Sequence, residues 1–135
     1  MEGAFVKGRL PGEAWVEIEK PPKNCLQALE HRNMKHTGLY LYAQKTQEDV
    51  QSFLEGFSRN LKKLGYTITV REELFLKNGT WHNFIAEKPG VISRVYAKKE
   101  GGVLLWVLFS SADATSYALL HRDVERYLSN LRYER

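Results

Sequence analysis

Residues 46–87, TQEDVQSFLEGFSRNLKKLGYTITVREELFLKNGTWHNFIAE, join a helical pattern directly to a hairpin pattern. In the first half, apolar side chains recur at three- and four-residue spacing, which predicts a helix with one apolar stripe. The stripe consists of Val50, Phe53, Leu54, Phe57, Leu61 and Leu64. Thr46 precedes it with Asp49 three residues later, a spacing that predicts a capping box. Gly65 predicts the helix end, because glycine adopts a left-handed conformation without steric cost.

The second half of this stretch predicts two antiparallel strands. Residues 66–77 form the first strand in this prediction, and residues 80–87 form the second. The Asn78-Gly79 pair between them is typical of a two-residue type I′ turn. The sequence of the whole stretch therefore predicts a helix that ends at Gly65, followed by a β-hairpin.

Glu72 is the polar exception on an otherwise apolar strand face. The predicted turn places Glu72 opposite Ile85 and the adjacent Glu73 opposite Phe84. Adjacent strand residues point to opposite faces, so the two carboxylates do not form a catalytic pair. We expect Glu72 to lie near a sheet edge or to meet an arginine or lysine.

Further apolar runs predict the rest of the fold. Strands are expected at residues 4–10, 14–20, 26–32, 38–45, 91–99 and 103–109. Ser111 or Asp113 is available as the N-cap of a final helix. The apolar stripe of that helix comprises Tyr117, Leu120, His121, Val124, Tyr127, Leu128 and Leu131.

Two of the strands carry apolar residues on both faces, which predicts central positions covered on both sides. They are residues 38–45 and 103–109, and the second contains no polar residue. The two amphipathic helices are the available covers. The sequence therefore predicts an α+β fold: an antiparallel β-sheet of about six to seven strands flanked by two amphipathic helices, an α/β/α sandwich. We expect a single domain over residues 1–135.

Composition excludes several classes of protein. The chain is 43% hydrophobic and 12% aromatic, which is typical of a compact domain. Its net charge of +4 is spread among interleaved acidic and basic residues, which argues against a nucleic-acid surface. Cys25 is the single cysteine, so no intrachain disulfide forms. No run approaches the ~20 apolar residues that a transmembrane helix needs, and no signal peptide is evident.

Several short motifs resemble one fold family. They are LPGEAW at 10–15, GLYLY at 38–42, the helix-glycine-strand junction at 53–66, the hairpin at 76–80 and YLSNLR at 127–132. Together they resemble the Mog1/PsbP-like fold and, within it, the small bacterial DcrB-like or lipoprotein-like domains. The resemblance covers residues 5–132, although residues 20–24 are longer and richer in proline than the family pattern.

The resemblance implies a non-catalytic accessory or adaptor domain that binds a protein partner, in an assembly or chaperone-like role, without a cofactor. Family members include a Ran-binding nuclear-transport protein and extrinsic subunits of photosystem II. The alternative is a small-molecule or lipid-binding module with a cavity between sheet and helix. We expect a monomer or weak homodimer. The expected location is cytoplasmic as the chain stands, or periplasmic or lipoprotein-anchored if a signal segment was removed.

Catalytic and metal-binding patterns are sparse. His31 and His36 are five residues apart, which is not the spacing that places two imidazoles on one helix face. His82 and His121 are the candidate general bases of a third hypothesis, a hydrolase or isomerase. Neither has a nucleophile or second carboxylate at a recognisable spacing. We therefore predict no catalytic, metal or cofactor site.

Aromatic residues supply the candidate partner-binding site. Trp15, Trp81 and Tyr96 lie in strands of more polar register; core or rim packing is the favoured interpretation of each, and one or two of them are the candidate exposed anchors. Arg94 and Lys98 flank Tyr96 on one strand face, a pattern that suits an acidic partner, or else a solvated face. These five residues form the predicted site.

Overall fold

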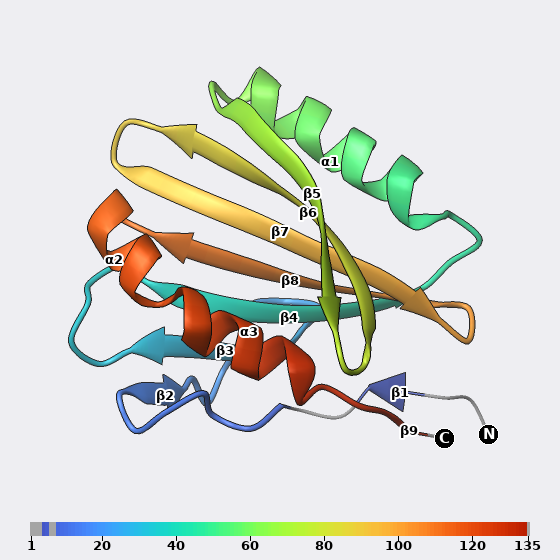
Figure 1. The fold of residues 1–135 in the computed structure, drawn as a ribbon, viewed down its shortest axis with the longest axis horizontal. Coiled ribbons are helices and arrows are strands. Elements are labelled where there is room, and N and C mark those ends of the chain that lie inside the picture. Colours follow the sequence, from blue (N-terminus) through green and yellow to red (C-terminus); the bar gives the residue numbers. More distant parts are fainter. Residues whose placement is uncertain (1–3, 6–7, 135) are drawn as a thin grey trace.

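The computed structural model describes residues 4–5 and 8–134 (Figure 1). In chain order they form β1 (Ala4–Phe5), β2 (Trp15–Glu17), β3 (Cys25–His31), β4 (Gly38–Lys45), α1 (Val50–Lys63), β5 (Thr67–Leu76), β6 (Gly79–Lys88), β7 (Val91–Glu100), β8 (Val103–Ser111), α2 (Ala114–Leu119), α3 (His121–Ser129) and β9 (Tyr133–Glu134). The predicted α+β class is confirmed.

Seven strands form one antiparallel sheet in the order β2-β3-β4-β8-β7-β6-β5. β8 lies between β4 and β7, so the apolar run at 103–109 is central, as predicted. β1 and β9 form a separate two-stranded sheet, which brings the two ends of the chain together (Figure 1). These two short strands are too brief for an alternating pattern to indicate their pairing.

Helices pack on both faces of the sheet. α1 packs against β5, β6 and β7, whereas the α2–α3 pair covers the opposite face (Figure 1). The two hydrophobic clusters draw on alternating residues of the same strands: Leu104 packs in the α1 cluster and Leu105 in the α2–α3 cluster. This alternation follows from the two-residue period of a strand.

The ends of α1 agree with the prediction at one terminus only. The N-cap is Asp49, whose side chain accepts a 2.8 Å hydrogen bond from the Ser52 N–H, so the capping box led by Thr46 is wrong. The Thr46 hydroxyl instead accepts a hydrogen bond from the Glu48 N–H. This is a local turn contact, and Thr46 therefore does not cap the helix. At the other end Gly65 has a φ of +95°, which confirms the left-handed stop.

The β5–β6 hairpin differs from its predicted register by two residues. Leu76 pairs with Gly79, so that Lys77 and Asn78 form the loop and the type I′ turn at Asn78-Gly79 is wrong. Glu72 consequently faces Asn83, and Glu73 faces His82. A tertiary contact explains the change: the Asn78 amide donates to the Leu128 and Leu131 carbonyls at 2.7 and 3.1 Å.

The predicted final helix is two helices. α2 begins at the predicted N-cap Asp113, whose side chain accepts from the Ser116 N–H at 2.7 Å. The chain leaves helical geometry at Leu120, where φ is −96° and ψ is 3°. The predicted apolar stripe nevertheless reaches the core on both sides of this break, because Leu120, Val124 and Leu128, spaced four residues apart, are all buried there.

Candidate binding surface

The five residues predicted as a binding patch are buried. Trp15, Trp81 and Tyr96 are at most 1% exposed, and Arg94 and Lys98 are each 8% exposed. Their exposure was inferred from polar neighbours in sequence, but the α2–α3 pair covers this face of the sheet. Core packing, the favoured interpretation of Trp15, Trp81 and Tyr96, is therefore confirmed. The interpretation of one or two of them as exposed anchors, and of the strand face with Arg94 and Lys98 as a solvated or docking face, is wrong.

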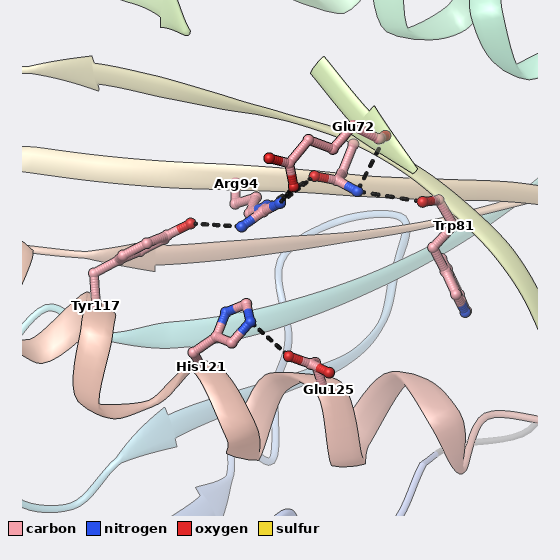
Figure 2. Close-up of polar contacts among 7 residues, drawn as sticks. Glu72, Trp81, Arg94, Tyr117, His121 and Glu125 are labelled. Atoms are coloured by element: carbon pink, nitrogen blue, oxygen red, sulfur yellow. Dashed lines mark hydrogen bonds and ion pairs between the residues drawn. The ribbon is translucent and has the colours of Figure 1, made fainter. Parts of the chain in front are cut away.

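Arg94 is the centre of a structural hydrogen-bond network (Figure 2). Its Nε and Nη2 donate to Asn83 Oδ1 at 2.8 and 2.6 Å, and Nη2 also lies 3.1 Å from Glu72 Oε2. Nη1 donates to the Tyr117 hydroxyl at 3.2 Å, which links β7 to α2. The expected arginine partner of Glu72 is thus confirmed, and β5 is an edge strand as well.

The other predicted anchors also join elements of the fold. Trp15 Nε1 donates to Asp123 of α3 at 2.9 Å. Lys98 donates to the Asn78 carbonyl, and its Nζ lies 5.5 Å from the centre of the Trp81 ring. Burial raises the pKa of Tyr96, whose hydroxyl has no hydrogen-bond partner among the described residues. These contacts hold α3 and the hairpin against the sheet.

His82 and His121, the two candidate general bases, each contact one glutamate near the surface. His121 pairs with Glu125 one turn later on α3 at 2.5 Å (Figure 2). His82 contacts Gln51 at 3.2 Å and Glu73 at 3.8 Å. Within residues 4–5 and 8–134, no three histidine, cysteine, aspartate or glutamate side chains are placed to hold a metal ion.

One part of the sheet has no helix over it. α1 packs over β5–β7 and reaches Trp106 and Leu108 on β8, whereas no described helix lies over the same face of β4 and β3 (Figure 1). On β4 and β8, five of the residues that face α2–α3 are at most 1% exposed: Leu39, Leu41, Leu105, Val107 and Phe109. Their neighbours on the bare face are half-buried: Tyr40, Tyr42, Trp106 and Leu108. We call these four residues the open half-sheet.

Aromatic rings dominate the open half-sheet. Tyr42 and Trp106 stack with ring centres 4.1 Å apart and an interplanar angle of 10°. Trp106 also meets Phe53 and Phe57 of α1 at 5.4 and 5.2 Å, so the surface is continuous with the edge of the helix. Partial burial raises the pKa of both Tyr40 and Tyr42, which keeps their hydroxyls neutral.

Two solvent-open hollows flank this surface. One has a volume of about 690 Å³ and is bounded by the segment from Lys23 to Leu26 together with Tyr42 and Trp106. The other, of about 600 Å³, is bounded by residues 30–32 and 34–37 together with Tyr40 and Leu108. The apolar stripe therefore has a recess at each end.

Sequence reasoning placed the strands of this surface correctly and their coverage in part. Residues 103–109 were predicted to be covered on both faces: Leu104 is fully buried in the α1 cluster, whereas Trp106 and Leu108 pack against that cluster but are only half-buried. A simple dimension explains the incomplete cover. One helix is about 10–12 Å wide, whereas seven strands spaced about 4.8 Å apart span roughly 30 Å. A single helix therefore leaves much of one face bare.

The sheet between α1 and the α2–α3 pair defines the class of protein: an α+β sandwich with the Mog1/PsbP-like fold. Comparison of sequences alone identifies no relative, since no protein-family model and no curated protein matches the chain. None of the described helices combines the length and the apolar character that crossing a membrane requires.

Solved structures carry the fold assignment. PsbP (CyanoP) from Synechocystis sp. PCC 6803 superposes with a TM-score of 0.65 at 6% identity, over 97% of this chain and 92% of that protein. LpqN of Mycobacterium tuberculosis, which is involved in cell envelope biogenesis, superposes with a TM-score of 0.64 at 11% identity, over 99% and 85% of the two chains. A Bacteroides thetaiotaomicron protein gives 0.55 at 10% identity, over 90% of this chain but 42% of its own length.

Proposed function

We propose that this chain is a non-catalytic binding domain that docks a protein partner on the open half-sheet. The observation that carries the proposal is the half-buried aromatic surface of Tyr40, Tyr42, Trp106 and Leu108 beside α1. Stable domains rarely leave contiguous apolar surface bare unless it contacts another molecule. Tyrosine and tryptophan are also the residues most often found as anchors of protein interfaces.

The shape of the surface favours a polypeptide over a small ligand. Small-molecule sites are concave and enclose most of their ligand. The two hollows here are open to solvent and lie at opposite ends of the stripe. An extended segment that crosses from one hollow to the other covers the rings between them.

A site-specific photo-crosslinking experiment tests the proposal. We would place p-benzoylphenylalanine at Tyr42 and, as the matched control, at Leu119, an exposed apolar residue of α2. In cells of the natural source, the Tyr42 probe should crosslink to one discrete protein that the Leu119 probe does not reach. Equal labelling from both positions, or no product from Tyr42, would refute docking on the open half-sheet.

The small-ligand alternative places its cavity between sheet and helix. A hollow of about 230 Å³ lies between α1 and the β5–β6 hairpin, lined by Leu54, His82 and Phe84 among others. It is smaller than the ~300–1,000 Å³ that ligand pockets usually enclose. Native mass spectrometry of the purified chain separates the two proposals, because a retained ligand adds a defined mass that denaturation removes.

A further inference from the structure

We infer that the partner segment on the open half-sheet is an acidic peptide segment that carries aromatic or aliphatic side chains. This inference rests on the proposed function and adds the chemistry of the partner. Its basis is the charge around the two hollows, taken together with the apolar stripe that joins them.

Cationic side chains stand at both ends of the stripe. Lys23 lines the hollow beside Tyr42, and Arg32 and Lys35 line the hollow beside Tyr40. The latter hollow also contains His31 and His36, against one carboxylate, that of Glu30. An occupant of this surface therefore meets positive charge on either side of an apolar centre.

These cations are free to meet a partner. No carboxylate within the described part of the chain forms an ion pair with Lys23, Arg32 or Lys35. Two buried cations of the core, by contrast, are engaged: Arg94 pairs with Glu72 and Lys98 with Glu100. An acidic segment binds here without displacing an internal partner, and its attraction to the lysines and arginine is screened by salt beyond a Debye length of about 8 Å.

The order of cationic and aromatic side chains along the surface indicates the sequence pattern of the bound segment. Tyr40 and Tyr42 project from the same face of β4 about 6.6 Å apart, since strand residues rise about 3.3 Å each. A segment with apolar side chains over the rings places its flanking residues at the hollows. The complementary sequence is acidic at both ends and apolar in the middle, which is electrostatic complementarity around a hydrophobic anchor.

The same combination of cations and aromatic rings occurs in single-strand nucleic-acid sites, but the geometry here disfavours that occupant. Base stacking needs a free aromatic face. Trp106 is stacked on Tyr42 and packed against Phe53 and Phe57, so its ring is already engaged.

The test is a selection of random 12-residue peptides on the full chain, followed by affinity measurement of individual peptides. The charge variant is the triple substitution Lys23→Gln, Arg32→Gln and Lys35→Gln. The matched control removes three exposed cations that line neither hollow, with Arg59→Gln, Lys77→Gln and Arg122→Gln. A Tyr42→Ala variant reports whether a selected peptide uses the open half-sheet.

We expect the selected peptides to be enriched in aspartate or glutamate around an apolar centre. Their affinity should fall about tenfold for the charge variant, change less than about twofold for the control variant, and weaken as salt is raised. Peptides that need Tyr42 but show no acidic enrichment and bind the charge variant equally would overturn the inference and leave the proposed function standing.

Two other outcomes point elsewhere. If no selected peptide depends on Tyr42, the proposed function fails and the inference falls with it. If oligothymidylate binds the chain and loses affinity in the charge variant while acidic peptides do not bind, the surface belongs to a nucleic acid and the inference is wrong.

Discussion

Replacing Arg94 with methionine tests the buried network that holds α2 to the sheet. Methionine keeps the apolar stem of the side chain and removes all of its donors. Asn83 is 2% exposed, and its Oδ1 accepts from both Nε and Nη2 of Arg94. A buried acceptor left without a donor costs about 1–3 kcal/mol. The Glu72 side chain is 58% exposed, so its ion pair adds at most about 1 kcal/mol.

We therefore expect Arg94→Met to lower the free energy of unfolding by about 2 kcal/mol or more. Urea denaturation followed by tryptophan fluorescence should show a midpoint lower by about 1 M, because slopes for small domains are about 1–3 kcal/mol per molar urea. The control Glu72→Gln should change the free energy of unfolding by about 1 kcal/mol at most. A larger loss for Glu72→Gln than for Arg94→Met would show that the reasoning about Asn83 is wrong.

Three other substitutions test the helix ends and the core. Gly65→Val should lower the free energy of unfolding by about 1 kcal/mol or more, because valine strains the left-handed position; an unchanged melting curve would contradict this. Leu105→Ala should cost about 2–5 kcal/mol in denaturant unfolding, since Leu105 is fully buried on β8. The backbone N–H of Ser52 lowers the pKa of Asp49, so its stabilisation is present above the unfolded pKa and lost as pH falls through the folded pKa. The melting temperatures of Asp49→Ala and the unsubstituted chain should differ at neutral pH and converge in acid.

The fold was predictable where local rules decide it. The apolar run of β8 indicates a central strand, and Gly65 indicates the end of α1. The predictions were wrong where contacts with residues distant in sequence determine the local structure. Asn78 takes its conformation from carbonyls of the α3 region, some 50 residues away in sequence, which the Asn-Gly rule ignores. The break between α2 and α3 at Leu120 has no counterpart in the apolar spacing of residues 117–131, which continues through it.

The candidate site was less predictable than the fold. Polar neighbours suggested that Trp15 is exposed, but its indole N–H bonds Asp123, 108 residues later, and no local pattern signals that partner. Alternation along a strand tells which residues share a face, not which layer covers that face. The open half-sheet follows from the limited width of α1, which is about 10–12 Å against the roughly 30 Å of a seven-stranded sheet.

The most direct test of the central claim is a crystal structure of the chain bound to a selected peptide that requires Tyr42. The account predicts that the peptide lies across β4 and β8, with an apolar side chain against Tyr42 and Trp106 and a carboxylate at Lys23 or Arg32. A peptide paired instead along the free edge of β5, with the open half-sheet still bare, would contradict it.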